Sequence, residues 1–142
     1  MYKRQHIGCI GTAHAVELGR AAQQLGYDAV SSVTPFYYGF TTDEIKQYYF
    51  DIADAVDLPM LVYNIPSKSG VTMRVQDLSE LLCDSRMLGV KYTSNDFFAL
   101  EQVKTAHPDK LVYNGHDEMF LAGLAMGADG GIEMCIRDSD HI

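Results

Sequence analysis

The sequence predicts an α/β fold built on a parallel sheet, because short apolar runs alternate with longer helical patterns along the chain. Continuous apolar runs are typical of strands that are covered on both faces, as in a parallel sheet. The expected strands are His6–Ile10, Ala29–Val33, Pro59–Tyr63, Leu88–Tyr92, Lys110–Tyr113 and Gly130–Ile132. Two architectures fit this order, an open doubly wound sheet or part of a barrel. A complete eight-stranded barrel takes roughly 250 residues, and this chain has 142.

Helical patterns fill the intervals between the expected strands, and turn residues delimit several of them. The expected helices are Ala13–Leu25, Thr42–Val56, Arg74–Cys83, Asp96–Ala106 and Asp117–Met126. Gly26 ends the first helix, since glycine readily takes the left-handed conformation found after a helix. Thr41 offers a capping hydroxyl to the second helix. Pro108 follows the fourth helix because proline cannot continue one.

Composition and charge exclude several classes of protein. The chain carries 11 Lys and Arg against 19 Asp and Glu, a net charge of −8, which disfavours binding to nucleic acid or to an anionic membrane. It lacks the run of about 20 apolar residues that crosses a bilayer. Cys9, Cys83 and Cys135 form no CxxC pair, which argues against a disulfide framework and a zinc site. We therefore expect a cytoplasmic protein without a metal.

Lys91 is the most informative single residue, because it closes the apolar run that forms the fourth expected strand. In parallel α/β folds the chemistry lies where strands end and helices begin. An amine withdrawn from water favours its uncharged form, which can attack a ketone and form a Schiff base. The alternative is an ordinary lysine whose charged end reaches solvent from the strand end.

Two further strand ends carry groups that suit catalysis or binding. Tyr63 closes the third expected strand, where a phenol could shuttle a proton to a substrate oxygen; the alternative is a core aromatic with a bonded hydroxyl. Asp117 and Glu118 follow the fifth strand, either as acceptors for substrate hydroxyls or as first-turn acids that complement the helix dipole.

Three strings, Thr34–Tyr38, Tyr63–Pro66 and Gly89–Ser94, resemble the N-acetylneuraminate lyase / dihydrodipicolinate synthase family, and the likeness runs from His6 to Ile132. The resemblance implies a class I aldolase on a (β/α)8 TIM barrel that uses pyruvate through a lysine Schiff base. It further implies that this chain holds about six of the eight barrel strands, namely strands 3 to 8.

The resemblance also assigns roles to particular residues. Lys91 matches the Schiff-base lysine and Tyr63 the proton-shuttling tyrosine. Tyr37 matches the aromatic that, in the synthases of this family, reaches across a subunit interface and supports the active site. The residues that match the sugar-binding positions of the sialic acid lyase branch are Thr93, Gly115, Asp117 and Glu118.

The implied reaction cleaves N-acetylneuraminate (sialic acid) to N-acetylmannosamine and pyruvate, with no metal or organic cofactor. The resemblance implies a homotetramer for the intact parent protein. Two other functions stay open, a dihydrodipicolinate synthase-like or other pyruvate-dependent aldolase, and a non-catalytic doubly wound binding module. In the binding module, Lys91 is an ordinary strand-end lysine.

Some positions depart from the family pattern. Lys68 stands where many synthases have a carboxylate-binding arginine, and Met134 stands where a serine is expected. The family's carboxylate-binding loop after the second barrel strand has no counterpart, so we expect catalysis by this piece to be impaired. Residues 1–5 and 133–142 resemble one transposase end sequence translated in two frames. Residues 6–132 are therefore interpreted as a partial barrel domain with non-native ends.

Overall fold

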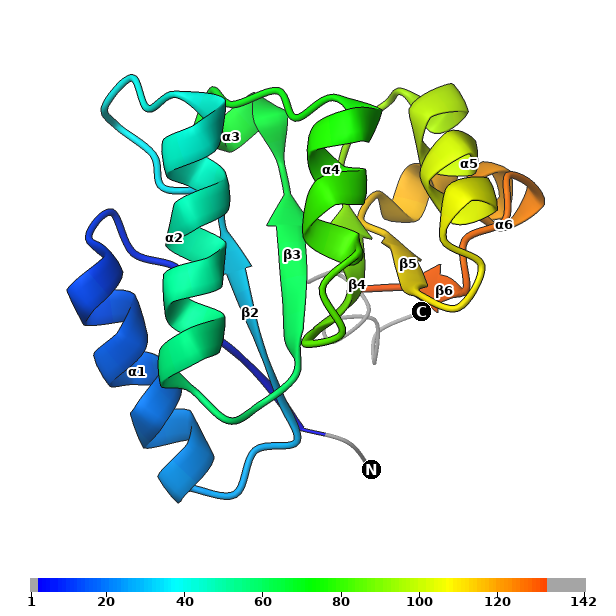
Figure 1. The fold of residues 1–142 in the computed structure, drawn as a ribbon. Helices are drawn as coiled ribbons and strands as arrows, with labels where there is room; N and C mark the ends of the chain where they lie inside the picture. The colour runs from blue at the N-terminus through cyan, green and yellow to red at the C-terminus, as the bar shows by residue number, and fades with distance from the viewer. Residues whose placement is uncertain (1–2, 133–142) are drawn as a thin grey trace.

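The computed structural model describes residues 3–132, whose six strands form one parallel sheet in the order β1-β2-β3-β4-β5-β6 (Figure 1). The strands are β1 (Arg4–His6), β2 (Ala29–Val33), β3 (Met60–Asn64), β4 (Met87–Tyr92), β5 (Leu111–Asn114) and β6 (Gly130–Gly131). A doubly wound sheet reverses its strand order at a switch point, whereas a barrel keeps the order of the chain. The observed order therefore confirms the prediction of a partial TIM barrel and excludes the doubly wound alternative.

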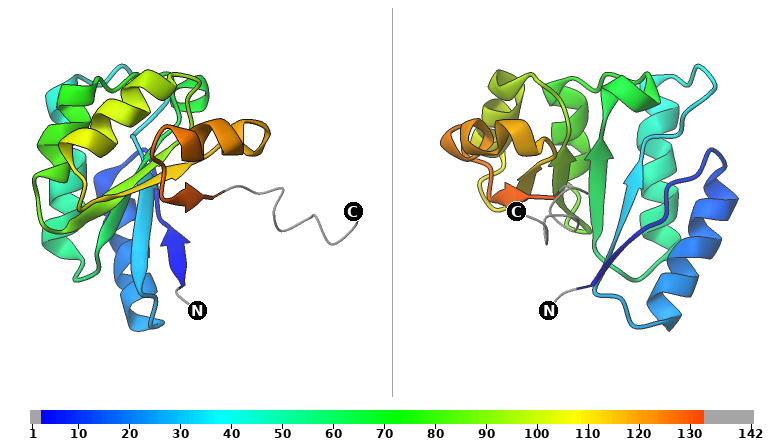
Figure 2. Two further views of the ribbon diagram at one scale, coloured as in Figure 1. Left: turned by 90° about the vertical axis from the view of Figure 1, so that its right-hand side faces the viewer. Right: turned by 180° about the vertical axis from the view of Figure 1, so that it is seen from behind.

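The helices lie on one face of this sheet, and the sheet curves as half of a barrel does (Figures 1 and 2). They are α1 (Thr12–Gln24), α2 (Thr42–Ala55), α3 (Pro66–Ser69), α4 (Val75–Leu82), α5 (Phe97–Ala106) and α6 (Phe120–Ala125), with a 3-10 turn η1 (Asp117–Met119) before α6. The concave face without helices is the side that becomes the interior of a closed barrel.

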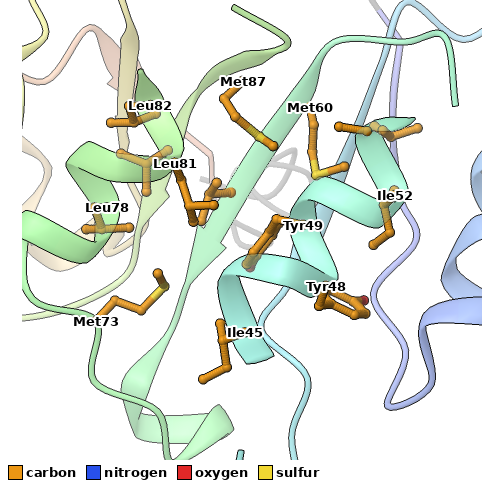
Figure 3. Packing of buried hydrophobic residues seen from close by; sticks show 14 of the residues in the cluster. Ile45, Tyr48, Tyr49, Ile52, Met60, Met73, Leu78, Leu81, Leu82 and Met87 are labelled. Carbon is orange, nitrogen blue, oxygen red and sulfur yellow. The ribbon is translucent and has the colours of Figure 1, made fainter. Parts of the chain in front are cut away.

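The core lies between the helices and the convex face of the sheet. Tyr49 and Ile52 from α2 and Leu81 from α4 are fully buried against the strands (Figure 3). Strand residues that alternate along the sequence supply the other side of this core, which includes Val62 and Val90. The residues between them, at odd positions such as 63 and 91, consequently face the concave side.

Most predicted elements occur within one or two residues of their expected ends, and the differences have local causes. The first strand is Arg4–His6, not His6–Ile10, because parallel pairing places Arg4 opposite Ala29 and His6 opposite Ser31. The Ile7 N–H donates the last bond to the Ser31 carbonyl, after which the chain turns toward α1. The last predicted helix is divided into η1 and α6.

The short helix α3 (Pro66–Ser69) was not predicted, since its four residues show no helical period. Proline is at its first position, where the missing N–H is not needed. Gly70 ends the helix in the left-handed conformation, with φ at 71°. Residues 4 and 5, assigned above to a non-native end, pair with β2; residues 1–2 and 133–142, with Met134 and Cys135, lie outside the described residues.

Candidate active site

Lys91 and Tyr63 lie side by side on the concave face of the sheet, near the carboxyl ends of β4 and β3. The parallel register sets Tyr63 opposite Lys91, and Lys91 opposite Tyr113 on β5. The Lys91 Nζ lies 4.2 Å from the centroid of the Tyr63 ring. Lys91 is only 5% exposed, so its amine is held among neighbours and does not extend into water. An aromatic face at this distance attracts a cation, whether an ammonium or a protonated imine.

Thr93 and Gly115 lie close together, directly after the ends of β4 and β5. The Thr93 N–H donates to the Asn64 carbonyl at 2.8 Å, and the Gly115 N–H donates to the Tyr92 carbonyl at 3.0 Å. A Cβ added to Gly115 would lie 1.9 Å from the Thr93 Oγ1. Only glycine permits this close approach, and the structure thus brings together two residues that the sequence assigned to one site.

The Thr93 hydroxyl is a buried polar group that lacks a partner among residues 3–132. Thr93 is 6% exposed, and its Oγ1 makes no hydrogen bond there. Buried hydroxyls are normally bonded, so an unbonded one at a strand end is an exception, and a bound ligand is one way to satisfy it. Thr93 borders a cavity of about 260 Å³. The other residues that line this cavity are Pro66, Ser67, Ser94, Asn95, Asp96 and His116.

Asp117 and Glu118 lie in η1, directly after the turn that carries Gly115. The Glu118 Oε1 lies 3.5 Å from the His116 Nδ1, and the Glu118 side chain is 74% exposed. Both carboxylates therefore follow β5, the strand next to β4, at the same carboxyl-terminal edge of the sheet as Lys91 and Thr93. The structure records no direct contact between either carboxylate and Lys91.

Tyr37 lies apart from these residues, in the loop between β2 and α2. It is 82% exposed and adopts a φ of 80°, in the left-handed region that side chains rarely occupy. Its ring packs edge-on against Tyr38, with the centroids 5.0 Å apart. Backbone strain of this kind concentrates at functional loops, but within the described residues Tyr37 does not touch the Lys91 amine.

His6 is a neighbour of Tyr63 to which the sequence alone assigns no role. Its ring lies perpendicular to that of Tyr63, with the centroids 6.0 Å apart. The only sequence signal for His6 is its position in the first expected strand. No sequence motif links a histidine there to a tyrosine two strands away. Its proximity depends on sheet curvature and register.

Two structural features bear on cofactors and membranes. Among residues 3–132, no three His, Cys, Asp or Glu side chains are grouped so that they could hold a metal ion. No helix in this described range is both long enough and apolar enough to span a bilayer.

Comparisons with known proteins relate this geometry to a family. CdNal from Clostridium difficile, solved in complex with mannosamine, superposes with a TM-score of 0.92 at 41% identity, over 94% of this chain and 46% of that one. An N-acetylneuraminate lyase from Fusobacterium nucleatum gives 0.87 and 42%, over 94% and 46%. A dihydrodipicolinate synthase from Acinetobacter baumannii, complexed with pyruvate, gives 0.91 and 32%, over 95% and 47%.

The chain thus spans less than half the length of each of these solved proteins. It nevertheless retains their fold over nearly all of its own length. The dihydrodipicolinate synthetase family matches residues 4–137, which include every residue of the site described above. The chain therefore belongs to the dihydrodipicolinate synthetase family.

Proposed function

We propose that the protein to which this chain belongs is a class I aldolase that cleaves N-acetylneuraminate to N-acetylmannosamine and pyruvate. The observation that carries the proposal is the Lys91 amine, held at a strand end 4.2 Å from the Tyr63 ring centroid. A buried amine beside a phenol supplies a nucleophile and a proton carrier for the same substrate.

In the proposed reaction, the Lys91 Nζ attacks the ketone carbon of the open-chain sugar acid, and loss of water forms an imine. The protonated imine accepts the electron pair of the breaking C3–C4 bond, which leaves an enamine and an aldehyde. Tyr63 takes the proton of the C4 hydroxyl. Tyr63 then returns this proton to C3 of the enamine, and water hydrolyses the imine to release pyruvate and Lys91. Neither a metal nor an organic cofactor is needed.

We base the choice of N-acetylneuraminate, among the substrates of pyruvate-dependent aldolases, on the side chains that follow β4 and β5. We assign hydroxyl binding to Thr93, Gly115, Asp117 and Glu118. The unbonded Thr93 hydroxyl supports this assignment, as do the two acceptor carboxylates at the same sheet edge. Carboxylates are pure acceptors, which suits a ligand rich in hydroxyl donors. The neighbours named for N-acetylneuraminate lyase and mannosamine, at 41–42% identity, support the same choice.

We place the intact protein in the cytoplasm, acting in carbohydrate metabolism as a homotetramer, with Tyr37 at a subunit interface. The cysteines support a reducing compartment, since Cys9 and Cys83 are free in the described structure. The exposed, strained Tyr37 beside Tyr38 supports an interface role, because exposed aromatics are enriched at protein–protein contacts.

A dihydrodipicolinate synthase-like activity is the second candidate, and Lys68 is the observation that favours it. Lys68 lies exposed in α3, directly after the strand that carries Tyr63. A cation there could hold the carboxylate of a small aldehyde substrate. A panel containing N-acetylneuraminate and aspartate semialdehyde separates the two activities. Lys68→Ala should lower turnover only if the second candidate is correct.

Reductive trapping tests the shared step of both aldolase proposals. The chain is incubated with pyruvate and borohydride, and the modified residue is located by peptide mass spectrometry. We expect one pyruvate adduct on Lys91, none in Lys91→Ala, and an unchanged adduct in Lys46→Ala, which removes a lysine of α2 that is paired with Asp43 and Glu80. The same measurement is made on a longer protein that contains this sequence. An adduct that persists in Lys91→Ala, or that forms in neither protein, refutes the aldolase proposal.

A further inference from the structure

His6 is a titratable side chain on the concave face that the proposed reaction does not use. It ends β1, opposite Ser31 of β2, and its ring reaches across β2 to Tyr63 of β3. The two rings are perpendicular, at 90°, with their centroids 6.0 Å apart. This edge-to-face arrangement is one that aromatic pairs favour. The Lys91 amine contacts the same Tyr63 ring.

The backbone around His6 fixes the orientation of its ring. The Val33 N–H donates to the His6 Nε2 at 3.3 Å. Gly8 leaves room for this contact, because a Cβ there would lie 2.9 Å from the His6 Cε1 and 2.7 Å from the Val33 Cγ2. An imidazole that accepts through Nε2 is neutral and carries its proton on Nδ1. The structure thus selects one protonation state of His6.

The charges around His6 favour the same state. Arg4 faces it from β1, Tyr63 from β3 and Lys91 from β4, whereas the adjoining residues of β2, Ser31 and Val33, carry no charge. Desolvation lowers the pKa of His6 most, and the positive charges of Arg4 and Lys91 lower this pKa further. The imidazole is consequently neutral at neutral pH.

We propose that His6 is a positioning residue, which fixes the Tyr63 ring against the Lys91 amine while its own imidazole is bonded to the Val33 amide. This inference rests on the proposed aldolase function. Protonation of His6 turns its Nε2 into a second donor that faces the Val33 N–H, so the bond is lost. It also adds a cation next to Lys91. Acid therefore releases Tyr63 from its position through the protonation of His6.

A test that needs no activity follows the ring of Tyr63 directly. Tyrosine is labelled with ¹³C, the Tyr63 signal is assigned with Tyr63→Phe, and spectra are recorded from about pH 5 to 8, where histidine titrates. We expect the Tyr63 signal to titrate together with the His6 imidazole. This titration should disappear in His6→Gln and His6→Phe, and it should persist in His14→Gln, which removes an exposed histidine of α1. A Tyr63 signal that does not titrate, or that titrates in His6→Gln, overturns the inference.

A second readout is the pH profile of pyruvate trapping at Lys91. One pH unit below the His6 midpoint, the wild-type rate should fall about tenfold, since one unit of pH changes a protonation ratio tenfold. His6→Gln retains an acceptor for the Val33 N–H but does not titrate, so the fall that belongs to His6 should be missing from its profile. Identical profiles in both proteins overturn the inference. An intact Tyr63 titration without any adduct supports the His6 contact and counts against the aldolase proposal.

Discussion

Replacing Gly115 with alanine should destabilise the protein through a single steric contact. The new Cβ would lie 1.9 Å from the Thr93 Oγ1, and this separation must increase to at least 3.4 Å for ordinary contact. Rotation of the threonine side chain does not relieve the overlap, because the Thr93 Cβ and Cα lie 2.8 and 3.1 Å from the same point. The bond from the Gly115 N–H to the Tyr92 carbonyl, at 3.0 Å, opposes separation of the two strand ends.

Overpacking of a closely packed site costs about 1–3 kcal/mol. A protein of this size loses roughly 2–4 °C in melting temperature per kcal/mol, so Gly115→Ala should melt ~2–12 °C below the unmodified chain. The assay is thermal unfolding followed by circular dichroism. Gly39→Ala is the matched control, because a Cβ at Gly39 meets nothing within 4 Å. It carries the same change in unfolded-chain entropy.

The double variant Thr93→Ala/Gly115→Ala tests whether the Thr93 hydroxyl is the main obstacle. Truncation of Thr93 removes the atom at 1.9 Å and leaves contacts at 2.8 Å and beyond. We therefore expect Gly115→Ala to cost less in the Thr93→Ala background, which a double-mutant cycle measures. Equal melting temperatures for Gly115→Ala and Gly39→Ala would refute the reasoning, and so would strictly additive effects in the cycle.

Two further predictions concern the stability of the fold, one for a leucine in the core and one for an ion pair. Leu81 is 0% exposed in the core, so Leu81→Ala should cost about 2–5 kcal/mol in urea unfolding, whereas Leu25→Ala, at a residue 75% exposed, should change little. The side-chain hydrogen bonds from Arg86 lower the pKa of Asp84 to about 2. Because this pKa is depressed, the stabilisation is present above the unfolded value near 3.9 and is lost as pH falls toward 2. Asp84→Asn should remove that acid-dependent loss, and an unchanged pH dependence would contradict the assignment.

Local sequence patterns predict most of the helices and strands. They are least reliable for a strand whose bounds depend on its pairing with a neighbouring strand. The second strand has the predicted bounds, Ala29–Val33, since four of its five apolar and small residues are buried. The first strand was displaced toward the chain start, because the register with β2 selects Arg4–His6, of which Arg4 and Gln5 are polar. A strand held by backbone pairing at a sheet edge needs no apolar pattern.

The same distinction applies to the candidate site. The sequence predicts Lys91 and Tyr63 as strand-end residues, and the register adds that they are direct neighbours. The contact between His6 and Tyr63 was not predictable, because it crosses an intervening strand and depends on the curvature of the sheet. The unbonded Thr93 hydroxyl likewise became evident only with its surroundings.

A one-residue irregularity between β3 and β4 decides which way Lys91 points. Met60 pairs with Met87, but Leu61 pairs with Gly89, so Leu88 is an extra residue on β4. Without that shift, Tyr63 would lie opposite Val90, and Lys91 would turn toward the helices and the apolar core. Gly89 permits the observed path, since a Cβ there would lie 1.9 Å from the Leu111 carbonyl oxygen. The irregularity thus moves a charge from the core to the concave face, where an amine can meet a substrate.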